Sequence, residues 1–124
     1  MKRSTVVACG LLVFIGCSVR TATVTHEIQT PQAPQLFEGM GGHHRAVTTS
    51  SAMAQRYFDQ GLIWAFAFNH DEAIRSFKEA ARLDPQCAMA WWGVALCNGP
   101  HINNPTVRPE RARAAWAALQ EALV

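Results

Sequence analysis

Apolar residues recur at the spacing of an α-helix along two consecutive stretches of the chain, residues 54–68 and residues 73–83. The polar pair at residues 69–70 interrupts this period, and Asp71 follows as a residue that can cap the next helix. The second stretch stops at residues 84–85, where proline disfavours the helical conformation of the residue before it. The pattern therefore predicts two helices joined by a tight turn.

The two predicted helices carry the spacing of a tetratricopeptide repeat, a helical hairpin of about 34 residues. Gly61 and Ala73 are small at the positions where the two helices of such a unit cross, and larger side chains fill the space around that contact. All the consensus residue types fall in register in this first unit, which we place at about residues 54–87. Its expected packing residues are Tyr57, Gly61, Trp64, Ala73, Phe77, Ala80 and Pro85.

A second unit is predicted at about residues 88–124. Trp91 occupies the position of the first unit's tyrosine, within an apolar stretch that predicts a helix, and Ala95 takes the place of the glycine. A loop at residues 101–108 then precedes Pro109, a residue type that is favoured at the first position of a helix. We expect the last helix to begin there.

Helical-repeat proteins usually need three or more units and a polar capping helix. Here the second unit is followed by no cap, which predicts an apolar end. We therefore expect a longer parent chain, an incomplete reading frame or self-association through the uncapped end.

From about residue 37 onwards the chain resembles a family of bacterial tetratricopeptide-repeat proteins. The segments that carry the resemblance are residues 43–49, 58–62, 67–73 and 87–93. The resemblance implies an all-α solenoid of helical hairpins in a typically much longer chain. Because members of this family have no established activity, it implies little about function.

In tetratricopeptide folds the first helices of successive units line a concave groove. The candidate groove residues are Phe58, Leu62, Phe66, Trp92 and Leu96, with Gln55, Ala65 and Met89 beside them. Because apolar residues stand where some superfamily members carry a cationic carboxylate clamp, we expect no such clamp and favour a hydrophobic peptide or an amphipathic helix as the ligand. The alternative interpretation is that further helices cover these residues as ordinary core.

The amino-terminal residues have the pattern of an export signal. Basic Lys2 and Arg3 precede an apolar run at residues 6–15, which is shorter than the roughly 20 residues that span a membrane. Cys17 follows a small residue and resembles the lipidated cysteine of bacterial lipoproteins, which becomes the first residue of the mature chain. A plain signal peptide with an incidental Cys17 is the alternative.

These features divide the chain into three parts: a signal peptide at residues 1–16, the lipidated Cys17 with a flexible linker at residues 17–50, and a helical domain at residues 51–124. The linker is predicted because residues 18–36 are rich in Thr, Gln and Pro and have no helical or strand period. We expect an exported lipoprotein of the bacterial cell envelope, on the outer membrane or facing the periplasm.

The charges do not favour a nucleic-acid partner. The formal net charge is +2, and removal of Lys2 and Arg3 leaves nine basic and nine acidic residues. Because basic and acidic residues alternate along the predicted helices, they indicate solvated helix faces and not a phosphate-binding stripe.

Candidate chemical groups are few. His43 and His44 are adjacent in a glycine turn, and they define an alternative function as an envelope metal-binding or enzyme-associated protein, although adjacent histidines rarely bind one ion together. Cys87 and Cys97 are about 15 Å apart if both lie on one helix, too far for a disulfide, so we expect buried free thiols or an interchain bond from Cys87. We find no catalytic motif and expect no enzyme activity, cofactor or metal.

The sequence thus favours a membrane-anchored helical-repeat module that binds a protein or peptide. The identity of that partner is not encoded in any motif of this chain.

Overall fold

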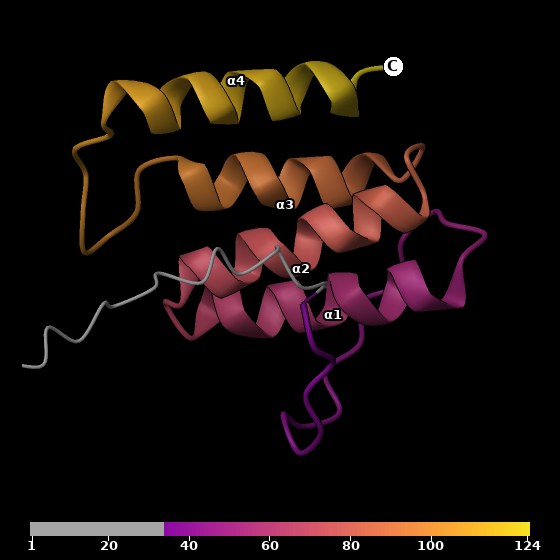
Figure 1. Cartoon of the computed structure of the whole chain (residues 1–124). Helices are drawn as coiled ribbons and strands as arrows, with labels where there is room; N and C mark the ends of the chain where they lie inside the picture. Colours follow the sequence, from indigo (N-terminus) through magenta and orange to yellow (C-terminus); the bar gives the residue numbers. More distant parts are fainter. Residues whose placement is uncertain (1–33) are drawn as a thin grey trace, which may run out of the picture. The chain divides into compact units, whose positions relative to one another are not determined.

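The computed structural model describes residues 34–124. In these residues four α-helices follow one another: α1 (Ala52–Phe66), α2 (His70–Leu83), α3 (Ala88–Asn98) and α4 (Pro109–Ala122). Successive helices run in opposite directions and each packs on the next, so α1 and α3 are parallel (Figure 1). The prediction of an all-α fold is confirmed, whereas Cys17 and the predicted signal peptide lie outside the described residues.

The helix boundaries follow from local chemistry. Ser51 caps α1 by accepting a hydrogen bond from the Ala54 N–H at 3.1 Å. Asn69 caps α2, since its side chain accepts from the Glu72 N–H at 3.4 Å. The prediction that Asp71 is the cap is therefore wrong. Asp71 lies inside the first turn of α2, where a carboxylate complements the positive end of the helix dipole.

The core is centred on Phe77 of α2, whose ring is fully buried. A Cβ atom added to Gly61 of α1, or to Gly93 of α3, would lie 2.6 Å from this ring. The Phe77 ring is therefore in contact with backbone on both neighbouring helices, and only glycine leaves room for it on either side. Phe58 adds a tilted aromatic contact, with its ring centroid 5.5 Å from that of Phe77.

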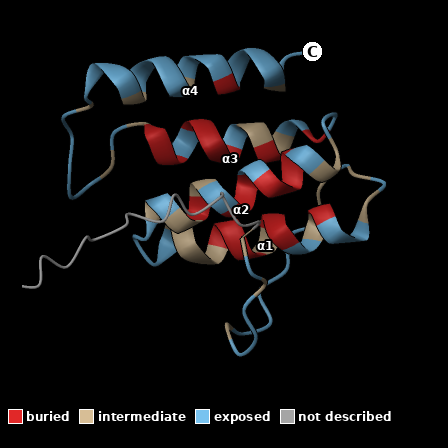
Figure 2. Ribbon diagram, in the orientation of Figure 1, coloured by how far each residue is buried: buried red, intermediate tan, exposed pale blue. Residues whose placement is uncertain are grey.

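Most of the predicted packing residues lie in this core. Five of the seven in the first unit are buried, Trp64 of that unit and Trp91 of the second unit are partly buried, and Pro85 is exposed in the turn after α2. Figure 2 shows that the buried positions of α1, α2 and α3 face one another, while α4 is exposed along most of its length. The five buried residues are Tyr57, Gly61, Ala73, Phe77 and Ala80, and Ala95 of the second unit is buried as well.

Residues 34–50, which we assigned to the flexible linker, are attached to α1. The Tyr57 hydroxyl donates to the Pro34 carbonyl at 2.9 Å. The Gln60 amide donates to the Gln35 carbonyl at 2.9 Å and accepts from the Phe37 N–H at 2.8 Å. The boundary at residue 51 is therefore too late, because these hydrogen bonds make the segment part of the helical domain.

Candidate functional site

The structure divides the predicted groove residues into two groups. Phe58 and Leu62 are 0% and 3% exposed and belong to the core, so they do not line an open groove in this chain. Phe66, Trp92 and Leu96 are 75%, 37% and 45% exposed. Only this second group is accessible to a ligand.

Met89, Trp92 and Leu96 lie on one face of α3, at intervals of three and four residues, and we call them the α3 stripe. The rest of the α3 surface is largely buried: Gly93 and Cys97 lie beside the stripe, and Val94 lies opposite it. A helix that is apolar on all sides is normally enclosed by protein. Because α3 instead leaves Trp92 and Leu96 accessible to water, the stripe is a candidate contact surface.

The corresponding face of α1 is occupied by the chain itself. The Gln55 side chain donates to the Arg45 carbonyl at 2.8 Å and accepts from the Val47 N–H at 3.0 Å. Asp59 accepts from the Arg45 N–H at 3.0 Å and is paired with the Nδ1 atom of His44 at 2.8 Å. An extended segment thus covers the polar part of α1 that we expected to face a ligand.

The His44 imidazole is therefore paired with the Asp59 carboxylate, which also accepts a hydrogen bond from the Arg45 N–H. Among residues 34–124, no group of three or more His, Cys, Asp or Glu side chains is arranged to hold a metal ion. The alternative function based on His43 and His44 gains no support from this arrangement.

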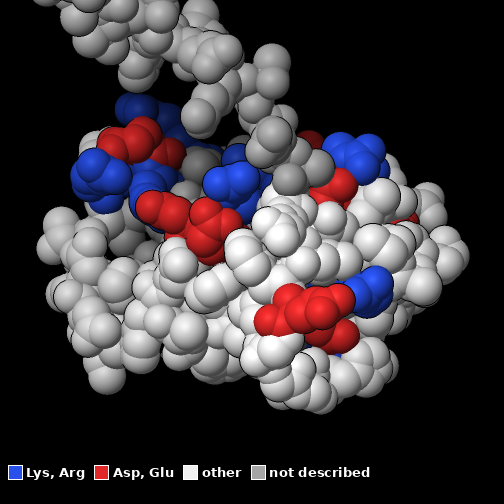
Figure 3. All heavy atoms as spheres, turned by 60° about the horizontal axis from the view of Figure 1, so that its bottom comes forward, with Lys and Arg blue, Asp and Glu red and all other residues white. Residues whose placement is uncertain are grey.

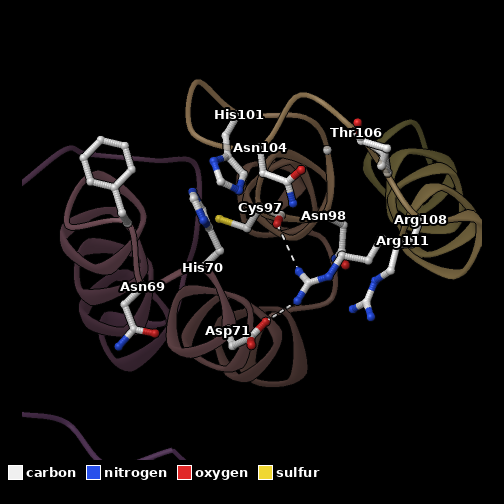
Figure 4. Close-up of a pocket in the computed structure, with 13 residues that line it drawn as sticks. Asn69, His70, Asp71, Cys97, Asn98, His101, Asn104, Thr106, Arg108 and Arg111 are labelled. Atoms are coloured by element: carbon white, nitrogen blue, oxygen red, sulfur yellow. Dashed lines mark hydrogen bonds and ion pairs between the residues drawn. The ribbon is translucent and has the colours of Figure 1, made fainter.

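A pocket of about 530 Å³ lies where α2 begins, α3 ends and α4 begins. The loop between α3 and α4 forms its remaining wall, and Figure 4 shows side chains of all these elements directed toward one another. The volume falls in the usual range for small-molecule sites. The lining residues are Phe68, Asn69, His70, Asp71, Cys97, Asn98, Gly99, His101, Asn104, Thr106, Val107, Arg108 and Arg111.

Two histidines stack in this pocket. The ring centroids of His70 and His101 are 4.2 Å apart and their planes differ by 34°. Burial, followed by the charges of His101 and Arg111, lowers the pKa of His70 below its ordinary value of 6.5, against the opposing effect of Asp71. The Nδ1 atom of His101 is buried and has no hydrogen-bond partner within the described part of the chain.

Arg111 connects the walls of the pocket. Its guanidinium group pairs with the Asp71 carboxylate of α2 and donates to the Cys97 carbonyl of α3 at 3.4 Å (Figure 4). Within residues 34–124, Cys87 and Cys97 are both buried and form no disulfide with each other, in agreement with the prediction of free thiols. Burial raises the pKa of the Cys97 thiol to about 11. At neutral pH this thiol is therefore protonated and is a poor nucleophile.

Charged side chains elsewhere are mixed in sign. In Figure 3 acidic and basic groups lie beside one another on the face shown. Two ion pairs on α2 are examples: Arg75 lies 3.2 Å from Glu72, and Arg82 lies 2.7 Å from Glu79.

Comparison of the chain with protein-family models, with curated proteins and with solved structures gives no match. Within residues 34–124, none of the helices combines the length and the apolar composition that a membrane crossing requires. The α3 stripe and the pocket are therefore the candidate functional features of the described residues.

Proposed function

We propose that this chain is a helical-repeat binding module of the tetratricopeptide type, which binds an amphipathic helix or an apolar peptide on the α3 stripe. The observation that carries the proposal is the exposure of Trp92 and Leu96 on a helix whose other face is already buried. An apolar ligand would remove this surface from water, at roughly 25 cal/mol for each Å² of apolar area.

The repeat type is supported by the contact between the units. Phe77, on the second helix of the first unit, packs between Gly61 of the same unit and Gly93 of the next unit. A second hairpin is thereby held against the first by the side chain that the repeat pattern singles out. This arrangement leaves the α3 stripe on a face that α2 does not cover.

A titration with a model amphipathic peptide of leucine and lysine tests the binding surface. We expect Trp92→Ala to weaken peptide binding by at least about ten-fold, or about 1.4 kcal/mol, because exposed tryptophans often dominate such interfaces. The measurement is fluorescence anisotropy of a labelled peptide, with circular dichroism to verify that the helical content is unchanged.

Trp116→Ala is the matched control, since Trp116 is 65% exposed but lies on α4 and is not part of the α3 stripe. It should leave the affinity within about two-fold of the unsubstituted chain, a change of about 0.4 kcal/mol. Equal losses in the two variants, or no saturable binding of the peptide, would contradict a specific surface on α3.

We further propose that the module is held at a membrane of the cell envelope by acyl chains on Cys17. One acyl chain binds a membrane only marginally, whereas two or more anchor a protein stably. In bacterial cells that express the whole chain, Cys17→Ser should move the protein from the membrane fraction to the soluble fraction. Mass spectrometry of the mature amino terminus is the direct measurement, and an unmodified Cys17 in the membrane fraction would refute the anchor.

A further inference from the structure

The pocket between α2, α3 and α4 combines cationic and hydrogen-bonding groups that the proposed peptide-binding function does not use. Two arginines, Arg108 and Arg111, line it, whereas Asp71 is the only carboxylate among the lining residues. Asp71 is already paired with Arg111. With both histidines neutral, the lining therefore carries an excess of one positive charge.

One buried polar atom and one helix start at the pocket lack a side-chain partner inside the described residues. The Nδ1 atom of His101 is buried without a hydrogen bond. The start of α4 lies at the same place, and its N-cap residue, Arg108, makes no side-chain capping bond. Unpaired N–H groups and the positive end of the helix dipole favour an anion beside them.

Arg108 is placed to meet a ligand at the rim. Its side chain is 71% exposed, and its one partner, Glu110, is 61% exposed at 3.0 Å. A pair exposed to this extent is held weakly, so its exchange for a ligand costs little. Arg111 is less exposed, at 30%, and its contacts with α2 and α3 hold its guanidinium group in place. It is therefore suited to position a ligand inside the pocket.

We propose that this pocket is a binding site for a small organic oxyanion, with a phosphate or carboxylate group held by Arg108 and Arg111 and the rest of the molecule beside the His70–His101 pair. The volume of about 530 Å³ exceeds that of an inorganic ion and fits a small metabolite. The site is separate from the α3 stripe, so failure of either proposal leaves the other intact.

The proposal predicts a coupling between anion binding and protonation. His70 is faced by Asp71 on its own helix, by Cys97 of α3, by His101 of the loop and by Arg111 of α4. An anion in the pocket would offset the positive neighbours that lower the pKa of His70, so bound anion should raise that pKa. By linkage, the affinity for an anion whose own charge stays nearly constant, such as succinate, should increase as the pH falls from 8 towards 6.

The experiment is an NMR titration of the folded protein with inorganic phosphate and, separately, with succinate, observed at the imidazole signals of His70 and His101. Sodium chloride at matched ionic strength is the reference for general salt effects. We expect saturable shifts with at least one of the two anions and a higher His70 pKa in its presence.

Arg108→Gln and Arg113→Gln form a matched pair of variants. Both remove one positive charge near the start of α4, but only Arg108 lines the pocket. We expect Arg108→Gln to weaken anion binding about three- to five-fold, the size of one partly exposed ion pair, and Arg113→Gln to leave it unchanged.

The proposal is overturned if neither anion gives saturable shifts, if chloride reproduces them, or if the two arginine variants have equal effects. Saturation by Zn²⁺ together with no response to either anion would also overturn it, in favour of a metal site on the histidines.

Discussion

Replacing Gly93 by alanine is expected to lower the free energy of unfolding by about 2 kcal/mol, although alanine is the better helix former by about 1 kcal/mol. The added methyl group would lie 2.6 Å from the ring of Phe77, which is fully buried and already in close contact with Gly61 on its other side. The overlap must therefore be relieved by separating α3 from α2. Chemical denaturation monitored by circular dichroism measures the change.

A double-mutant cycle identifies the contact as the cause. Phe77→Leu removes ring atoms from the space between the helices, so Gly93→Ala should cost at least about 1 kcal/mol less in that background than alone. Gly42→Ala is the control, because a Cβ at Gly42 has no neighbour within 4 Å. Additive effects of the two core substitutions would contradict the assigned contact.

Gly61→Leu on the other side of the ring should separate α1 from α2 in the same way.

The helices and their ends could be predicted because their signals are local. Apolar periodicity located all four elements, and Pro85 and Pro109 marked an end and a beginning that the structure reproduces. The cap of α2 was misassigned because Asn69 and Asp71 are both good capping residues, and only the backbone conformation of Asn69 decides between them.

The partner of Phe77 on α3 could not be predicted from the repeat spacing. Register with the first unit points to Ala95, whereas the backbone atoms in contact with the ring belong to Gly93. The spacing describes the crossing of two helices within a unit. The crossing between α2 and α3 depends on how one unit rotates on the next, which no periodicity specifies.

Neither the accessible part of the groove nor the pocket could be predicted from the sequence, because both depend on how the helices pack. Phe58 and Leu62 have the residue types of a binding surface, yet apolar groove residues and core residues are chemically identical, and the structure buries both. His70 and His101 are far apart in the sequence and meet only because α2 and the loop after α3 converge. The sequence places His70 at the break between two predicted helices and His101 in the predicted loop, and this loop at residues 101–108 is the one signal that could have indicated the site.

Gln60→Leu should have the second large effect, because Gln60 is the polar link between the amino-terminal segment and the helices. Its side chain, 5% exposed, bonds the Gln35 carbonyl, the Phe37 N–H and the Ser76 hydroxyl, which itself is fully buried. Because leucine has a similar volume, the loss of stability comes from polar groups that are left without a hydrogen-bond partner. The buried Ser76 hydroxyl left without its partner costs about 1–3 kcal/mol, and the partly exposed backbone groups of Gln35 and Phe37 add less, so we expect a total of about 2–3 kcal/mol.

Two measurements separate this local effect from general destabilisation. Hydrogen exchange at the Phe37 amide should accelerate in Gln60→Leu far more than exchange in α3, because the segment loses its attachment while the core around Phe77 remains. Adding Ser76→Ala removes one stranded hydroxyl and should recover about 1 kcal/mol. Gln120→Leu, at an exposed position of α4, is the control and should change stability by less than about 0.5 kcal/mol. A loss as small as that in Gln60→Leu would mean that residues 34–37 do not depend on Gln60, and the domain would then begin closer to the predicted boundary at residue 51.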